Sequence, residues 1–458
     1  MSAAHRPWRT DPHPPAWIGA TQPRGGVLGH LAELHHDPLG LFTRCAREYG
    51  DLVRLRLGPT RMVLVSHPAL VEDVLVTRHH HFHKNLNRRL GSALGNGLLV
   101  SEGSYWLRQR RMMQPAFHRQ RIDSLAETMV SVTKRALDGW HANPVRDLYL
   151  DMTDVSLQIV ARTLFGIDVS PDLQRIRQSS QVMTDHLRSR LFSLAMLLPD
   201  NVPTPGNLRY AGAIRDLDRL VYRLIAERRA IGHDRQNDLL STLLQDRDAD
   251  GQGLTDRQVR DEVFTMMSAG YDTTALAVTW AWVLLSQYPE AEARMRAEID
   301  AVLGNAPPSA ADLPRLPYVG SVVAETLRLY PSAWAIAREA VCDTQIAGEP
   351  VAKKSTVLVS PWVLHRDPRF FEQPAAFRPE RWADALAQRL PRFAYMPFGG
   401  GPRICLGSTF AQLEIVLLVT LLAQRFRVEL TDPTHPVEPI PVLTLQPSRP
   451  VQVAVSAR

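Results

Sequence analysis

One cysteine of this 458-residue chain stands in a glycine-rich segment near the C-terminal end. The segment runs from Phe398 to Gly407 with the sequence FGGGPRICLG, and an apolar stretch of helical periodicity follows it from about Ser408. Free amides and the positive end of a helix stabilise a thiolate, so we expect a lowered pKa for Cys405. The glycines let a flat molecule approach the backbone. The pattern predicts a thiolate site rather than a cysteine packed as a small hydrophobic residue.

A second group of reactive residues lies inside the long helix predicted from Asp256 to Gln287. The segment from Ala269 to Thr274 (AGYDTT) places two small residues, an acid and two alcohols in the helix interior. Glycine and threonine are poor choices there for stability, which indicates a functional reason for them. Without the cysteine segment, a helix kinked at Gly270 with no chemistry would be the better interpretation.

Two pairs of residues have helical spacing. Glu325 and Arg328 stand at i and i+3, which by itself usually means a surface ion pair of little value. Trp106 and Arg110 stand at i and i+4, so the indole and the guanidinium share one helical face. Such a face suits the binding of a carboxylate.

In combination, these segments resemble the cytochrome P450 family. The family pattern FxxGxRxCxG is matched at every specified position, by Phe398, Gly401, Arg403, Cys405 and Gly407. The helix segment matches the oxygen-activation pattern (A/G)Gx(D/E)T(T/S), the two spaced pairs match ExxR and WxxxR, and FRPERW at 377–382 is similar to the PERF-type signature. The signatures follow the family order, and the resemblance runs from about Leu52 to the C-terminus.

The resemblance implies haem b as cofactor, with Cys405 as the proximal thiolate ligand of its iron. It implies that Phe398 lies beside the sulfur and that the cations bind a propionate. The residues expected to contact the haem besides the ligand are Trp106, Arg110, Arg338, Phe398, Arg403 and Gly407. Lys84 is a further propionate candidate, for which a solvated loop lysine is an equally good interpretation. The resemblance also assigns proton delivery to Asp272 and Thr273, and a buried structural network behind the haem to Glu325, Arg328 and Arg378.

The implied reaction is insertion of one oxygen atom from O2 into a C–H bond or double bond of a hydrophobic small molecule. Two electrons must come from a separate partner, a ferredoxin or flavodoxin with its reductase, because the sequence lacks flavin and iron–sulfur motifs. By analogy, eight positions line the substrate pocket: Leu94, Leu98, Met266, Ala269, Ala333, Trp334, Ile336 and Leu443. They are mostly apolar, which suits a terpenoid, fatty acyl or polyketide-like substrate, although several could instead pack in the core.

Two other functions remain open from the sequence. A peroxygenase or isomerase on the same fold usually replaces the acid and the alcohol of the helix, and both are retained here. A non-catalytic haem-binding sensor or carrier would show no coupled oxygen consumption.

Composition excludes several classes. Hydrophobic residues make up 45% and charged residues 22%, which argues for an ordinary folded protein. The net charge is +6, from scattered arginines, so nucleic acid is not implied. Three distant cysteines exclude a disulfide framework and favour the cytoplasm. The most apolar stretches, Ala275 to Leu285 and Ile415 to Ala423, are too short to cross a bilayer, so we expect no membrane anchor.

The predicted organisation is a proline-rich lead-in over residues 1–26 and a single domain over 27–458. We expect a mainly α fold with a small β region (α+β), in which haem lies between the oxygen-activation helix and the helix after the cysteine segment. The predicted strands are the hairpin around Gly58-Pro59, from Leu52 to Val65, and the segment Thr356 to Val359. The predicted helices are Pro38 to Tyr49, Pro68 to Val76, Gly103 to Met113, Ile122 to His141, Asp151 to Phe165, Leu208 to Ala230, Asp256 to Gln287, Glu290 to Leu303, Tyr318 to Tyr330 and Ser408 to Gln424.

Overall fold

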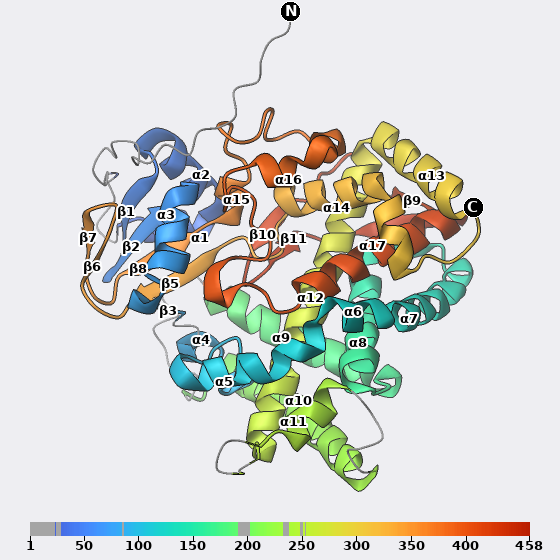
Figure 1. Ribbon diagram of the computed structural model, residues 1–458, viewed down its shortest axis with the longest axis horizontal. Helices are drawn as coiled ribbons and strands as arrows, with labels where there is room; N and C mark the ends of the chain where they lie inside the picture. Colours follow the sequence, from blue (N-terminus) through green and yellow to red (C-terminus); the bar gives the residue numbers. More distant parts are fainter. Residues whose placement is uncertain are drawn as a thin grey trace, which may run out of the picture.

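A computed structural model describes the chain at Pro23, 29–84, 87–190, 202–231, 238–247, 251 and 253–458. Helices dominate, and one small sheet lies to one side of them (Figure 1). The expected mainly α fold with a small β region is therefore confirmed. The proposed lead-in over residues 1–26 lies outside the described residues, apart from Pro23.

Most of the long helices lie where the sequence predicted them. Three have the predicted bounds: α2 (Pro38–Tyr49), α5 (Gly103–Met113) and α12 (Asp256–Gln287). Five begin and end within three residues of the prediction: α8 (Leu148–Phe165), α10 (Pro205–Ile231), α13 (Pro289–Leu303), α14 (Pro317–Leu329) and α17 (Ser408–Arg425). Proline at the first turn of α2, α13 and α14 starts them, because its fixed φ suits that position and its missing N–H has no partner to lose.

Other helices differ from the prediction. The expected helix from Ile122 to His141 is divided into α6 (Arg119–Ser124), α7 (Ala126–Asp138) and a 3₁₀ turn (Gly139–Ala142). The expected helix after Pro68 ends as α3 (Pro68–Glu72) and continues as a π turn (Asp73–Thr77). The sequence did not predict α9 (Leu173–Arg190), because its residues are mostly polar and few of them are buried. The other α-helices of the described residues are short: α1 (Leu31–His36), α4 (Asn87–Leu94), α11 (Leu239–Gln245), α15 (Pro361–Leu364) and α16 (Leu386–Arg389). Further 3₁₀ turns are His79–His81, Gln114–Phe117, Ser170–Asp172, Ala310–Arg315, Pro379–Ala385 and Gly401–Arg403.

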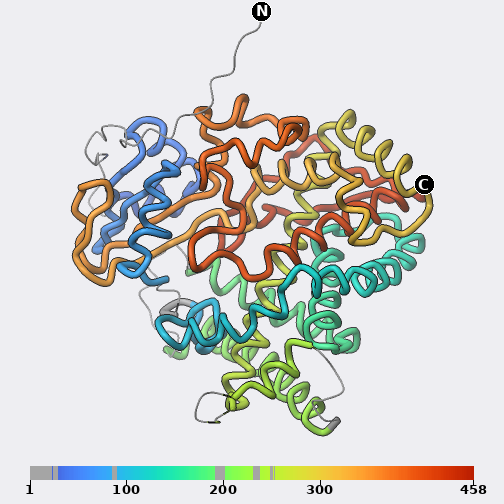
Figure 2. Tube along the Cα trace, in the orientation of Figure 1, coloured from blue at the N-terminus to red at the C-terminus, as the bar shows by residue number. Residues whose placement is uncertain are grey.

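The main sheet joins strands from distant parts of the chain. Its order is β1-β2-β8-β5-β3, with the strands β1 (Leu52–Leu57), β2 (Thr60–Val65), β8 (Thr356–Val359), β5 (Ile336–Ala340) and β3 (Phe82–His83). The predicted hairpin is present, and β8 pairs in parallel with β2, so the expectation that these segments share one sheet is confirmed. Figure 2 shows the orange strands beside the blue ones.

Smaller sheets lie elsewhere. One joins β4 (Val145–Asp147), β12 (Gln452–Ala457) and β9 (Phe426–Leu430). Two hairpins are formed by β6 (Thr344–Ile346) with β7 (Glu349–Val351), and by β10 (Pro439–Pro441) with β11 (Leu445–Pro447). The turn between β10 and β11 contacts α12 through Thr444, whose Oγ1 donates to Asp272.

The helix α12 crosses the molecule and packs along α8, α10, α14 and α17 (Figure 1). Twenty-one of its 32 residues are buried, as are twelve of the 18 residues of α17. Helices that are apolar on every face can only be stable inside a protein or a membrane. In the part of the chain that the structure describes, no helix combines the length and apolarity that a membrane span requires.

Candidate active site

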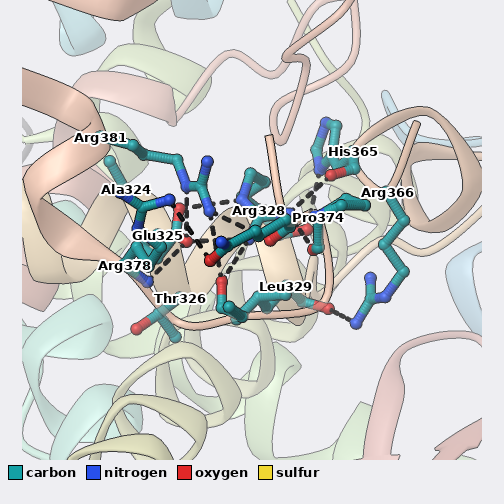
Figure 3. Close-up of polar contacts among 12 residues, drawn as sticks. Ala324, Glu325, Thr326, Arg328, Leu329, His365, Arg366, Pro374, Arg378 and Arg381 are labelled. Carbon is teal, nitrogen blue, oxygen red and sulfur yellow. Dashed lines mark hydrogen bonds and ion pairs between the residues drawn. The ribbon is translucent and has the colours of Figure 1, made fainter. Parts of the chain in front are cut away.

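A buried ion pair lies behind the cysteine segment. Glu325 and Arg328 of α14 have fully buried side chains, and Arg328 donates from Nε and Nη2 to the two carboxylate oxygens at 2.8 Å (Figure 3). Arg328 Nη1 also donates to the carbonyls of His365 and Pro374, at 2.8 and 2.7 Å. A buried pair is stable only when its remaining donors and acceptors are satisfied, and here they are.

The second arginine of this network is Arg381, and the prediction for the Arg378 side chain was wrong. Arg378 offers Glu325 only its backbone N–H, at 2.9 Å, while its side chain is 42% exposed and lies near Glu372. Arg381 Nε and Trp382 Nε1 donate to Glu325 at 2.8 and 2.9 Å. In a 3₁₀ turn the residues i and i+3 lie on the same face. The side chain of Arg381, three residues after Arg378, therefore reaches the Glu325 carboxylate that the Arg378 backbone N–H also contacts.

His365 joins this network to the chain that leads into the cysteine segment. It is fully buried, and burial together with the charge of Arg328 lowers its pKa to about 3, so the imidazole is neutral. Its Nε2 accepts from the Met396 N–H at 2.9 Å, which makes Nδ1 the donor to the Arg328 carbonyl at 3.2 Å. Sequence analysis did not identify His365 as a structural residue.

The cysteine segment is a tight backbone loop. The Cys405 N–H donates to the Phe398 carbonyl at 2.9 Å, and Gly401 has φ +68°, which favours glycine. A Cβ on Gly401 would lie 2.0 Å from the Leu75 carbonyl, and one on Gly400 would lie 2.1 Å from the Phe393 ring. Close packing of the loop against Leu75 and Phe393 therefore requires these glycines.

The protein alone raises the pKa of the Cys405 thiol, so the expected lowering was wrong. Burial is the largest cause, and it outweighs the hydrogen bond from Gly407 and the charges of Arg110 and Lys84, which all lower the pKa. Yet the side chain is exposed. Both observations hold for a side chain that is surrounded by protein atoms and still keeps accessible surface.

Cations converge beside this loop. Arg403 Nη1 donates to the Ser101 carbonyl at 2.8 Å, and its Nη2 pairs with Glu102. Its guanidinium lies 3.8 Å from the centre of the Trp106 ring, and that of Arg110 lies 6.0 Å from the same ring. Trp106 and Arg110 therefore share a face, as predicted from their spacing.

Lys84 and Arg338 belong to the same cluster. The Lys84 N–H donates to Glu102 at 2.7 Å and its Nζ donates to the Leu99 carbonyl at 3.1 Å, so it is no solvated loop lysine. Burial and the neighbouring arginines lower the pKa of Lys84 to about 7. Burial and Arg403 likewise lower the pKa of Arg338 to about 10.

This cluster fits an anionic cofactor edge. Lys84, Arg338 and Arg403 lie around one carboxylate, Glu102, and Arg110 lies beside Lys84 and Arg403. Burial lowers the pKa of all four, and repulsion between the cations lowers it further for Lys84, Arg338 and Arg403; two added carboxylates would offset that repulsion. The two propionates of haem supply such groups, and the glycine loop presents a sulfur ligand beside them, so the residues present fit the expected cofactor.

The small residues of α12 have different roles. Ala269 is exposed although most of its helix is buried, which leaves room for a ligand at this point. Gly270 instead packs against α8, since a Cβ there would lie 2.7 Å from Val160 Cγ2. Of the two small residues, Ala269 therefore leaves space and Gly270 serves helix packing. The helix is continuous over Asp256–Gln287.

Thr273 and Asp272 are held by defined partners. Thr273 Oγ1 donates to the Ala269 carbonyl at 2.8 Å. Asp272 accepts from Tyr149 Oη at 2.6 Å on one carboxylate oxygen and from Thr444 Oγ1 at 2.9 Å on the other. Burial raises the pKa of Asp272, and both hydroxyl donors oppose that rise. Sequence analysis missed Tyr149 and Thr444, because nothing local in the sequence marks either one.

The predicted pocket residues divide into three kinds. Ala269, Ala333 and Leu443 are exposed, and Ile336 is half-buried. The Ile336 side chain packs close to Gly399, since its Cδ1 would lie 3.5 Å from a Cβ added to that glycine. Leu94, Leu98 and Met266 are buried in the main hydrophobic core. Trp334 is buried in a separate core near the sheet, stacked on Phe42 with ring centres 6.2 Å apart, and donates to the Val442 carbonyl at 2.9 Å. Trp334 is therefore a packing residue.

Comparisons with known proteins agree with this geometry. A family model described as Cytochrome P450 matches residues 20–455. The chain is 36% identical to cyclooctatin synthase of Streptomyces melanosporofaciens, with 94% of each chain covered. It is 37% identical to cyclooctat-9-en-7-ol 5-monooxygenase of the same organism, with 90% of each covered. It is 35% identical to pentalenene oxygenase of Streptomyces avermitilis, over 94% of this chain and 96% of that protein.

Substituting Arg381 should destabilise the protein far more than substituting Arg378. Arg381→Met leaves the buried Glu325 carboxylate short of one charged partner, so we expect the free energy of unfolding to fall by about 3 kcal/mol. Arg378→Met keeps the backbone contact and removes an exposed side chain, so the loss should stay below about 1 kcal/mol. Chemical denaturation at equal haem content measures both. Equal losses in the two variants would contradict the assignment of Arg381.

Proposed function

The chain belongs to the cytochrome P450 family and is a haem-thiolate monooxygenase that acts on a hydrophobic substrate, and from this premise we propose that the substrate is a cyclic terpene. The observation that carries the proposal is the similarity, across nearly the whole chain, to enzymes whose names refer to cyclooctatin and pentalenene. The apolar, exposed Ala269, Ala333 and Leu443 support it, because a rigid hydrocarbon gains affinity chiefly by burying apolar surface.

We propose that Cys405 binds the haem iron through its sulfur. The haem then supplies the chemistry of dioxygen cleavage, which electron density from a thiolate favours. The propionates would be held by the cluster of cations and by the indole beside it: Lys84, Arg110, Arg338, Arg403 and Trp106. Phe398 and Gly407 shape the loop around the sulfur, Phe398 by accepting from the Cys405 N–H and Gly407 by its hydrogen bond to the thiol.

Proton delivery is the proposed role of Asp272 and Thr273. The carboxyl group of Asp272 carries a proton at physiological pH more readily than a solvated aspartate, because burial raises its pKa. Thr273 offers a hydroxyl one residue further along α12, next to the turn that begins at the exposed Ala269. Together they can transfer protons from the protein side of α12 to the site.

The other functions considered from the sequence have less support. The acid and the alcohol of α12 are both present, and the relatives are named as oxygenases, which favours O2-dependent catalysis over a peroxygenase, an isomerase or a haem sensor. We take residues 27–458 as one domain, and the family match over residues 20–455 supports this.

The enzyme needs two electrons from a redox partner, and we propose a ferredoxin or flavodoxin with its reductase, in the cytoplasm. Three free cysteines suit a reducing compartment. Exposed Arg111 lies on α5 one residue after Arg110, whose Nη1 donates to the Ile404 carbonyl at 2.9 Å beside Cys405. Such a cation could steer an acidic donor. Arg108 contributes less than its position suggests, because it pairs with Asp246 at 3.3 Å.

Cyclic terpenes should bind and be oxidised. The reduced protein under carbon monoxide should show the red-shifted Soret band typical of this family, and titration with pentalenene or cyclooctat-9-en-7-ol should perturb the haem spectrum of the oxidised protein. Turnover with NADH and a surrogate donor should then yield a product heavier by one oxygen atom, detected by mass spectrometry.

The control for that experiment is Cys405→Ala. It should lose the band, and a variant that retained the band would contradict the ligand assignment. Fatty acids that bind and react while both terpenes do neither would contradict the proposed substrate class.

Substituting Thr273 or Asp272 should separate electron use from product formation. Thr273→Ala should leave haem content and spectral binding nearly unchanged while diverting electrons to peroxide or water, because the hydroxyl serves proton delivery and not packing. Asp272→Asn should slow turnover about tenfold or more. Product and peroxide per NADH measure both effects. Unchanged yields in the two variants would remove the proton-delivery role.

Reversing one surface charge should slow electron transfer from an acidic donor. Arg111→Glu should give a lower second-order rate in stopped flow and a flatter dependence on ionic strength, since the steering attraction is lost. Arg219→Glu is the matched control, because Arg219 is 78% exposed but lies on α10. If both variants matched the unmodified protein, the donor would dock elsewhere.

A further inference from the structure

The turn between β10 and β11 places an exposed residue beside a partner of the proposed proton donor. Leu443 is 45% exposed although the turn lies against α12. The next residue, Thr444, donates from Oγ1 to an Asp272 carboxylate oxygen at 2.9 Å. One peptide unit therefore separates an accessible apolar side chain from a hydrogen bond to Asp272.

The rest of this turn is held firmly. Two buried indoles donate to it from opposite ends, Trp334 to the Val442 carbonyl and Trp280 to the Leu445 carbonyl, each at 2.9 Å. The Leu445 N–H donates to the Ser332 carbonyl at 3.0 Å. Ser332 Oγ in turn donates to the Thr273 carbonyl at 2.8 Å. The turn is thus tied to α12 at both residues of the proposed proton-delivery pair.

The carboxylate of Asp272 has a hydroxyl donor on each oxygen, Tyr149 from α8 and Thr444 from the turn. Tyr149 and Tyr271 are the titratable groups that face it among the described residues, and the turn contributes none. A carboxylate held at both oxygens keeps one orientation, and loss of one donor frees it to rotate about the Cβ–Cγ bond. The α8 contact is far from Leu443 along the chain, whereas the Thr444 contact is adjacent to it.

We propose that Thr444 is a positioning residue that transmits ligand contact at Leu443 to the carboxyl group of Asp272. A bulky ligand that displaces Leu443 moves the Thr444 hydroxyl, weakens its bond to Asp272 and leaves Tyr149 as the remaining anchor. The carboxyl group then changes orientation only when the pocket is filled. The inference rests on the proposed proton role of Asp272 for its meaning in catalysis, although the physical link can be measured without turnover.

The test is infrared difference spectroscopy of the haem-loaded protein, with and without clotrimazole, a bulky imidazole that binds haem iron whatever the natural substrate. Asp272→Asn identifies the carboxyl band of Asp272 by its loss. In the unmodified protein clotrimazole should shift this band. Leu443→Ala should reduce the shift, Thr444→Val should abolish it, and Thr444→Ser, which restores the hydroxyl, should recover it.

Binding and stability are measured alongside. Clotrimazole should bind all variants with dissociation constants within about threefold of each other, and the melting temperature of Thr444→Val should match that of Thr444→Ser within a few degrees. An Asp272 band that does not respond to clotrimazole in the unmodified protein would overturn the proposal. So would an undiminished shift in Thr444→Val.

These outcomes are separable from those of the turnover experiments. A ligand-dependent Asp272 band that depends on Thr444 supports the link even if Asp272→Asn retains full product yield, in which case the proton-delivery role alone is wrong. A normal loss of yield in Asp272→Asn with no response in the infrared band leaves proton delivery in place and removes the link.

Discussion

The buried ion pair between Glu325 and Arg328 is the interaction on which the position of the cysteine segment depends. Its charges are fully buried, so every donor and acceptor around them must be satisfied, and the partners come from three separate segments. Through His365, which bonds both Arg328 and Met396, the pair reaches the chain just before Phe398. The ion pair in α14 thereby helps to position the chain that leads to Cys405.

The helix α12 imposes the second constraint, since it is buried on almost every side and yet must present chemistry. Gly270 permits close approach of α8, and the neighbouring Ala269 is exposed and leaves space for a ligand. The polar residues that follow are stable there only because each has a partner: Ala269 for Thr273, and Tyr149 with Thr444 for Asp272. The same contacts that satisfy these groups also set their orientation.

Charge balance gives the cofactor side of the site its character. Lys84, Arg338 and Arg403 repel one another beside the single carboxylate of Glu102, and Arg110 adds its charge next to Lys84 and Arg403. Two further carboxylates would offset this repulsion.

The sequence by itself determined the family, the positions of most of the long helices, the first hairpin and the residues of the cysteine segment, because these signals are local: helical periodicity, proline starts and short fixed spacings. Only the tertiary structure decided that Arg381 and not the Arg378 side chain meets Glu325, and that Trp334 packs away from the pocket. It alone joined Asp272 to Tyr149 and Thr444, which lie 123 and 172 residues away. Contacts between such distant residues depend on how whole helices and turns pack, and no local pattern encodes them.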